Sequence, residues 1–261
     1  MNILFIGDIV GKKGRKALEA FLPSFIEENS IDFVIANAEN ASHGKGLNRE
    51  HMLDILSSGV DVITLGNHAF AKKELFTYID DYQEVLRPAN FHHIFPGKGS
   101  NIYVVNGKKI RVTNLIGRVF MPQGVENPFE TLEKIIDEEE KADIHIVDFH
   151  AEATGEKEAL AWDFDGKVSA ILGTHTHVPT ADLRLLPKGL AYQSDVGMVG
   201  PYNGILGSSR KEVILRTKTG YPSIFELEED GPTIVCATLL VVDDHTNKVL
   251  KMKPIQQLLE I

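Results

Sequence analysis

The first two thirds of the chain alternate short apolar runs with amphipathic segments, and this alternation limits the possible fold more than any other feature. Residues 2–7 are almost continuously apolar, as expected for a strand that is buried on both faces. Residues 15–28 then carry apolar side chains at helical spacing, and a second buried strand is predicted at residues 32–36. This pattern predicts an α/β sandwich of mixed parallel and antiparallel sheets covered by helices.

Three local signals place further elements. Asn48 should cap a short helix that ends near Leu56, and Asn106-Gly107 between two β-rich runs predicts a hairpin. Asn127-Pro128 should begin a helix that ends near Ala142. The remaining predictions are helices at 72–81 and 156–162, and strands at 60–65, 101–105, 109–116, 144–149, 168–172, 191–194, 233–242 and 249–252. We expect residues 1–261 to form one domain.

Composition excludes several classes of protein. The 261 residues include 27 Lys and Arg against 37 Asp and Glu, a formal net charge of −10. This excess argues against binding of long nucleic acids, because phosphate backbones need basic surfaces. The longest apolar run, near residues 234–242, is about half of the ~20 residues that a membrane helix needs. The lone Cys236 cannot form an internal disulfide, and no targeting segment is visible, so we expect a cytoplasmic protein.

Potential metal ligands follow one predicted strand after another. In open α/β sheets, ligands bind outside the carboxyl ends of the strands, so these side chains should converge on one rim. Their oxygen and imidazole donors, without thiolate, suit Mn, Fe, Zn or Ni. The residues are Asp8, Glu39, Asn40, Asn67, His68, His150, His175 and His177.

Seven or eight such residues are too many for one ion but enough for two ions ~3.5–4 Å apart, and Glu39 could bridge them. Alone, each has a common structural explanation: Asp8 a turn, Asn67 a helix cap, His150 a buried structural histidine. The coincidence of five strand ends favours a dinuclear site. His175 and His177 should point to the same side, as residues two apart do in an extended chain.

These motifs resemble, in order, those of the calcineurin-like metallophosphoesterase superfamily. Closer still is the resemblance to a bacterial subfamily of 2′,3′-cyclic-nucleotide phosphodiesterases, the YmdB-like proteins, and it covers essentially the full chain. The superfamily usually has His at the place of Val10 and Asp at the place of Glu39, whereas the subfamily is built around a Glu-Asn pair. The subfamily commonly carries an acid near the position of Ala69-Phe70-Ala71, which bears on substrate preference. The wider match rests on residues 7–8, 66–68, 150 and 173–177, and the narrower one on residues 7–11, 38–40, 148–154 and 194–201.

The resemblance implies a four-layer α/β/β/α sandwich with two metal ions, iron or manganese, and a homo-oligomer. It implies in-line attack of a metal-bridging hydroxide on a small cyclic nucleotide, with His68 as the general acid that protonates the ribose 2′ oxygen and leaves a 3′-phosphate. The implied ligands are Asp8, Glu39, Asn40 and His177 for one ion and Glu39, Asn67, His150 and His175 for the other.

Two other functions stay open. One is a broader phosphomonoesterase or nuclease. The negative net charge weighs against long RNA or DNA as its substrate. The other is a metal-loaded regulatory protein that binds a nucleotide with residual catalysis, against which His68 weighs, because a binding module needs no general acid. Of the remaining histidines, His145 is predicted to be structural and His51 to lie on the surface, while Cys236 should lie in the core.

Overall fold

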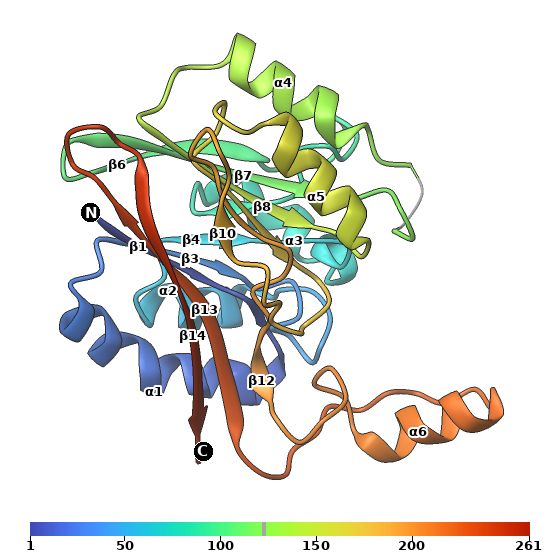
Figure 1. The fold of residues 1–261 in the computed structure, drawn as a ribbon. Coiled ribbons are helices and arrows are strands. Elements are labelled where there is room, and N and C mark those ends of the chain that lie inside the picture. Colours follow the sequence, from blue (N-terminus) through green and yellow to red (C-terminus); the bar gives the residue numbers. More distant parts are fainter. Residues whose placement is uncertain (122–123) are drawn as a thin grey trace.

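Two mixed sheets pack face to face in the computed structural model, which describes residues 1–121 and 124–261 (Figure 1). The first sheet has the strand order β2-β12-β13-β1-β3-β4-β5, with β14 paired to β13, and the second has the order β10-β11-β9-β8-β7-β6. Helices α1 and α2 cover the outer face of the first sheet, and α4 and α5 cover that of the second. The predicted four-layer α/β/β/α sandwich is confirmed.

The strands and helices have the following bounds. The first sheet contains β1 (Asn2–Ile6), β2 (Asp8–Ile9), β3 (Phe33–Asn37), β4 (Val62–Thr64), β5 (Val85–Leu86), β12 (Met198–Pro201), β13 (Thr233–Val242) and β14 (Val249–Leu259). The second contains β6 (Ser100–Val105), β7 (Lys108–Ile116), β8 (Ile144–His150), β9 (Ala170–Thr174), β10 (Arg184–Leu185) and β11 (Ala191–Gln193). The α-helices are α1 (Gly11–Asn29), α2 (Arg49–Ser57), α3 (Leu75–Tyr78), α4 (Pro128–Glu138), α5 (Thr154–Asp163) and α6 (Arg210–Thr219), and short 3₁₀ helices span Ala69–Ala71 and Ile79–Asp81.

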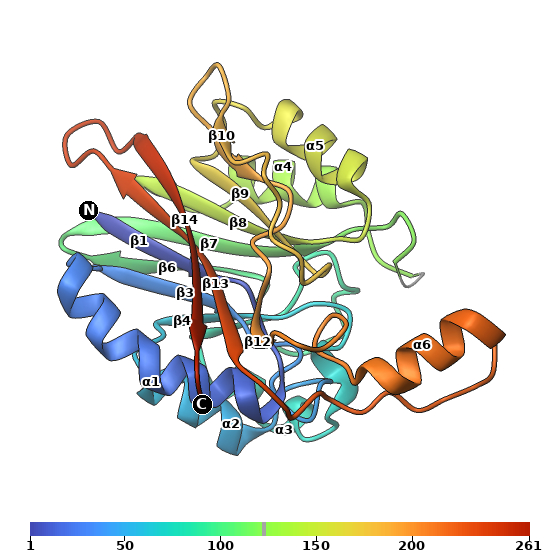
Figure 2. The ribbon, with the colours of Figure 1, turned by 60° about the horizontal axis from the view of Figure 1, so that its bottom comes forward.

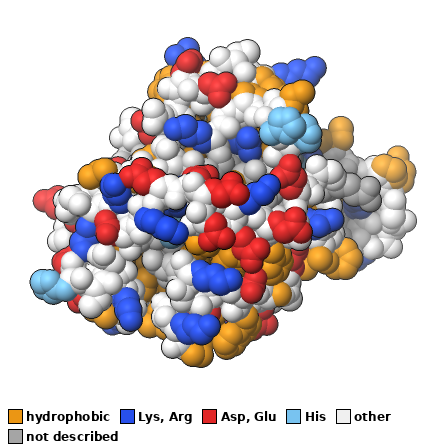
Figure 3. Space-filling model, turned by 90° about the horizontal axis from the view of Figure 1, so that it is seen from above, with side chains coloured by type: hydrophobic (Ala, Val, Ile, Leu, Met, Phe, Trp, Pro, Cys, Tyr) orange, Lys and Arg blue, Asp and Glu red, His pale blue; other side chains and the backbone are white. Residues whose placement is uncertain are grey.

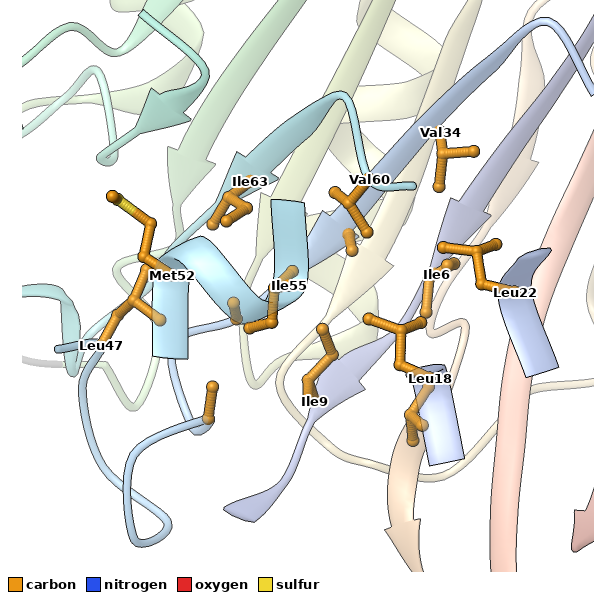
Figure 4. Packing of buried hydrophobic residues seen from close by; sticks show 14 of the residues in the cluster. Ile6, Ile9, Leu18, Leu22, Val34, Leu47, Met52, Ile55, Val60 and Ile63 are labelled. Atoms are coloured by element: carbon orange, nitrogen blue, oxygen red, sulfur yellow. The ribbon is translucent and has the colours of Figure 1, made fainter. Parts of the chain in front are cut away.

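Strand alternation produces the layered core. Leu4 and Ile6 point from β1 to the helix layer, whereas Ile3 and Phe5 point to the second sheet. Figure 4 shows the helix layer at close range. There Ile6, Ile9, Val34 and Ile63 of the first sheet meet Leu18 and Leu22 of α1 and Met52 and Ile55 of α2.

Parallel pairing places the ends of the central strands at common edges. β1, β3, β4 and β5 run parallel in the first sheet, as do β7, β8, β9 and β11 in the second. The polar residues that follow the central strands of each sheet therefore leave from one edge.

The local signals at element ends are confirmed. The Asn48 side chain accepts a hydrogen bond from the His51 amide, and Asn127 caps α4 by accepting one from the Phe129 amide. Asn106 and Gly107 both adopt positive φ, 51° and 78°, which a two-residue type I′ turn requires.

Other expectations are wrong. Residues 72–81 do not form one helix but only α3 and a 3₁₀ turn, and Phe76 of α3 packs on Phe70 in an aromatic group that also includes Phe91 and Phe95. Helix α4 ends at Glu138, not near residue 142, and β14 extends to Leu259. His51 is buried rather than exposed, because its Nδ1 lies 2.8 Å from the Ser42 hydroxyl.

One segment projects from the body of the molecule. The arm, residues 209–226, contains α6 and is closed at its base by a hydrogen bond from the Ser209 amide to the Glu226 carbonyl (Figures 1 and 2). No described residue of α6 is buried. On the face seen in Figure 3, basic and acidic side chains are interspersed. Among the described residues, no helix is long and apolar enough to cross a membrane.

Candidate metal centre

The structure brings the predicted ligands of both sheets to one place. Asp8 begins β2, Glu39 and Asn40 follow β3, and Asn67 follows β4 in the first sheet. From the second sheet come His150, the last residue of β8, and His175 and His177, just after β9. Ligand atoms of Glu39, His150 and His175 all lie within 4.8 Å of one another.

The Nε2 atom of His150 lies at the middle of this group. It is 3.0 Å from Glu39 Oε1, 3.0 Å from Asn67 Oδ1 and 3.0 Å from His175 Nδ1. One ring nitrogen can donate only one hydrogen bond, so this group holds more lone pairs than hydrogens. A cation would satisfy such a group.

The outer nitrogens of the three histidines are each bound to an acceptor. His177 Nδ1 donates to the Leu206 carbonyl at 2.9 Å, and His175 Nε2 donates to Glu152 Oε2 at 3.1 Å. His150 Nδ1 lies 2.9 Å from Thr174 Oγ1. In a neutral ring, a proton on the outer nitrogen leaves the inner nitrogen with a free lone pair, which is the arrangement that metal-binding histidines adopt.

Asp8, Asn40 and His177 form the second part of the centre. Asp8 Oδ1 is buried and has no hydrogen-bond partner among the described residues, although it lies 3.8 Å from His177 Nε2. The Asn40 amide nitrogen lies 3.1 Å from the same Nε2, and a half-turn of the amide would present Oδ1 there. The orphaned carboxylate oxygen and the inward lone pairs fit a metal site.

His68 lies beside the centre without joining it. Its backbone amide donates to Glu39 Oε2 at 2.8 Å, which fixes the position of its side chain. The ring lines a cavity of about 170 Å³ together with Glu39, Asn40, His175 and His177. Burial lowers the pKa of His68, and the negative charge of Glu39 opposes this shift.

Burial and mutual attraction perturb the other titrating groups. Burial opposes the charged form of His150, but Glu39, Asp8 and Asp148 outweigh it and raise its pKa to about 9. Burial would raise the pKa of Glu39, but His150 and His68 lower it to about 2. Burial raises the pKa of Asp8 to about 6. A cation must therefore displace a proton from His150, so metal uptake should release protons.

The two histidines after β9 do not lie in extended chain. His175 has φ 104° and His177 has φ 65°, both in the left-handed region that non-glycine residues rarely adopt. The expectation that they share a side through strand alternation is wrong; a strained turn turns both inner nitrogens toward the centre.

The centre also leaves no room for a side chain at residue 66. A Cβ on Gly66 would lie 2.5 Å from both Glu39 Oε2 and His150 Nε2.

Sequence reasoning missed the residues behind the centre. Asp148 accepts hydrogen bonds from Asn37, Thr64 and Thr174. The Thr174 hydroxyl has only one proton, and this hydrogen bond to Asp148 occupies it. Thr174 must then accept from His150 Nδ1. The available signal was position, since Asp148 stands two residues before His150 and faces the same side of β8.

A buried ion pair supports the loop that carries His175 and His177. Lys157 Nζ lies 3.0 Å from Asp195 Oδ2 and donates to the Thr174 carbonyl at 2.9 Å. Asp195 also accepts the Thr176 amide at 2.9 Å. Nothing in the sequence distinguishes Lys157 from an exposed lysine.

A family model described as "YmdB-like protein" matches residues 4–255. The chain belongs to the YmdB-like family. It is 48% identical over 256 residues to 2′,3′-cyclic-nucleotide 2′-phosphodiesterase of Bacillus subtilis, which covers 98% of this chain and 96% of that protein. The resemblance stated from the motifs is therefore confirmed.

Solved structures agree on the fold. A hypothetical protein from Thermus thermophilus superposes with a TM-score of 0.93 at 41% identity, covering 99% of both chains. A putative 5′-nucleotidase from Staphylococcus aureus superposes with a TM-score of 0.60 at 16% identity, covering 98% of this chain and 54% of that one. This second likeness shows that the chain shares its fold with that protein.

Proposed function

We propose that this YmdB-like chain hydrolyses 2′,3′-cyclic nucleotides to 3′-phosphates at the candidate metal centre. The observation that carries the proposal is the convergence of the inner ring nitrogens of His150, His175 and His177 on the carboxylates of Asp8 and Glu39. Its family and its 48% identity to the Bacillus subtilis enzyme make the chain a phosphodiesterase. The substrate in that relative's name supports cyclic nucleotides as the substrates of this chain.

The donors fit two metal ions. When bound, the ions would supply Lewis acidity for the phosphate oxygens and lower the pKa of water toward ~7. The oxygen and imidazole donors suit iron or manganese. The residues that would hold them are Asp8, Glu39, Asn40 and His177 for one ion, and Glu39, Asn67, His150 and His175 for the other.

His68 would act as the general acid. Its ring lines the cavity, and its amide is held by Glu39, so the imidazole can reach a substrate without taking part in the lone-pair group. Like the charge of Glu39, the negative charge of a bound phosphate would raise the pKa of His68 and so favour its imidazolium form. The proton would pass from the ring to the departing ribose 2′ oxygen.

A single substitution tests this role. His68→Ala should keep its metal content and lose ~10²–10⁴-fold in turnover, the usual contribution of general acid catalysis. His245→Ala, at an exposed loop histidine, is the matched control and should change neither quantity. Loss of metal in the His68 variant would make His68 a ligand and end its assignment as the acid.

A panel of chromogenic esters separates the alternatives. Hydrolysis of bis-p-nitrophenyl phosphate by the metal-loaded protein supports a phosphodiesterase. Activity confined to p-nitrophenyl phosphate would instead indicate a phosphomonoesterase, and inertness to both with metals bound would indicate a regulatory protein.

The arm supports the homo-oligomer that the resemblance implies. Its exposed large apolar side chains include two in the segment that follows α6, with Ile224 87% and Tyr221 65% accessible, and no described residue of α6 itself is buried. Exposed apolar area of this kind marks interaction surfaces. We expect the Tyr221→Ser/Ile224→Ser variant to have a lower mass by light scattering, whereas Ile94→Ser, at another exposed isoleucine, should not.

A further inference from the structure

A recess with an excess of basic side chains lies beside the candidate metal centre. This cationic recess has a volume of about 360 Å³ and is lined by Lys12, Lys13, Arg15, Lys16 and His43, among others. Val10 and Leu227 line both the recess and the cavity that contains His68. The two spaces therefore adjoin across an apolar wall made by these two side chains.

The positive charges of the recess are not neutralised by the hydrogen bonds they make. Lys12 and Lys16 are exposed and form no hydrogen bond or ion pair with any described residue. Lys13 and Arg15 donate to the neutral carbonyls of Gly231 and Ala41. The three lysines thus keep their charge for a ligand, whereas the charges of Asp54 and Glu50 also act on Arg15.

The acidic residues of the recess offset only part of this charge. Glu228 Oε2 lies 3.4 Å from Arg210, and its Oε1 accepts the amides of Glu229 and Asp230. Glu229 is the remaining acidic side chain that lines the recess, and Ile261, whose α-carboxylate adds one more negative charge, lines it as well. On a chain with a net charge of −10, this local excess of positive charge favours an anion.

The charge excess extends over a short distance. A neighbouring cavity of about 370 Å³ shares Lys12, Arg15 and Lys16, but Glu19 and Asp54 also line it. The excess therefore suits one additional phosphate next to the metal centre rather than a long polyanion.

We propose that the cationic recess binds a phosphate on the 5′ oxygen of the cyclic nucleotide, so that the substrate carries two phosphates separated by its ribose. This inference rests on the proposed function and names the substrate class more narrowly. The ribose would lie over the wall of Val10 and Leu227, with the cyclic phosphate at the metal centre. Such a 5′ phosphate occurs on a phosphorylated mononucleotide and at the 3′ end of an RNA fragment.

Kinetics test the preference. For the metal-loaded wild type at low salt, kcat/KM for 5′-phosphoadenosine 2′,3′-cyclic phosphate should exceed that for adenosine 2′,3′-cyclic phosphate at least tenfold, and the ratio should fall as salt screens the lysines. Lys12→Gln/Lys16→Gln should bring the ratio close to one. Lys251→Gln, at the far end of β14, should leave it unchanged. A wild-type ratio of one overturns the inference.

The dinucleotide ApA with a terminal 2′,3′-cyclic phosphate distinguishes the two sources. Faster turnover of the dinucleotide than of the phosphorylated mononucleotide assigns the recess to RNA ends, and the reverse assigns it to mononucleotides. Either order supports a phosphate in the recess, provided that both exceed the substrate without a 5′ phosphate.

Binding separates this inference from the proposed function. Calorimetry should show that adenosine 3′,5′-bisphosphate binds the wild type at least tenfold more tightly than adenosine 3′-phosphate, and that Lys12→Gln/Lys16→Gln removes the difference. If no cyclic nucleotide is hydrolysed but this difference persists, the proposed function is wrong and the recess stands. Equal affinities with normal turnover would refute the recess alone.

Discussion

At the scale of single residues, the centre depends on which nitrogen of each histidine carries a proton. The Thr174 hydroxyl donates to Asp148 at 2.7 Å and so accepts from His150 Nδ1, which means that Nε2 is the nitrogen that loses its proton when a metal binds. Leu206 and Glu152 do the same for His177 and His175. Partners of this kind fix the tautomer and the ring orientation of metal-binding histidines.

Thr174→Val keeps the shape of the side chain and removes this hydrogen bond. We expect metal affinity to fall ~10–100-fold, measured by titration of the metal-free protein. Thr233→Val is the matched control, because the buried Thr233 hydroxyl has no partner among the described residues and its removal should leave metal affinity unchanged. Equal affinity in the Thr174 variant would show that the hydroxyl does not orient His150.

His145 predicts a pH dependence that is independent of the metal centre. Burial, with a contribution from Arg111, lowers its pKa to about 3, and its Nε2 bonds Thr113 at 2.8 Å. The unfolded chain takes up a proton below pH ~6.5 that the folded chain refuses, so this stability is complete above pH ~6.5 and is lost as the pH falls toward 3.

Urea unfolding at pH 7.5 and pH 5.0 measures this effect. Between these values the wild type should lose about 2 kcal/mol more of its free energy of unfolding than His145→Gln, which does not titrate. Identical losses in the two proteins would mean that His145 is protonated in the folded state.

At the scale of elements, prediction from the sequence succeeded where the signal is local. The buried strands, the Asn106-Gly107 turn and the Asn48 cap depend on adjacent residues, and the ligands could be found because each follows a strand. Helix α6 was missed because none of its described residues is buried and it has no apolar stripe. The acceptor for His177 is a backbone carbonyl of Leu206, 29 residues away, which no sequence pattern reports.

The Lys157–Asp195 pair joins α5 to the loop after β9. Removing one member of a buried pair leaves the other charge unpaired, so Lys157→Met should lower the free energy of unfolding by about 3–5 kcal/mol and weaken metal binding by loosening His175 and His177. Glu158 lies on the same helix and forms an exposed ion pair with Arg184 of β10. Glu158→Gln breaks that pair and should lower the free energy of unfolding by less than ~1 kcal/mol. Comparable losses in the two variants, measured by urea unfolding, would contradict this role for the buried pair.

At the scale of the whole molecule, the candidate metal centre joins the two sheets. Asp8, Glu39 and Asn67 come from one sheet and His150, His175 and His177 from the other, so ions bound there would cross-link the two central layers. A ligand that binds only the folded state stabilises it, by about 2.7 kcal/mol at a hundredfold excess over its Kd.

Removal of the metals should therefore lower the midpoint of thermal unfolding by several degrees, and added manganese should restore it. Calorimetry of the metal-loaded, chelated and reloaded protein measures both changes. An unchanged midpoint after complete loss of metal would show that the centre does not hold the sheets together.

The central claim concerns a phosphodiesterase that acts on 2′,3′-cyclic nucleotides. Its most direct test is the turnover of 2′,3′-cyclic AMP against 3′,5′-cyclic AMP by the protein loaded with manganese or iron, with the products identified. We predict faster hydrolysis of the 2′,3′-cyclic substrate and adenosine 3′-phosphate as its product. Hydrolysis of neither nucleotide by the fully metal-loaded protein, or adenosine 2′-phosphate as the product, would contradict it.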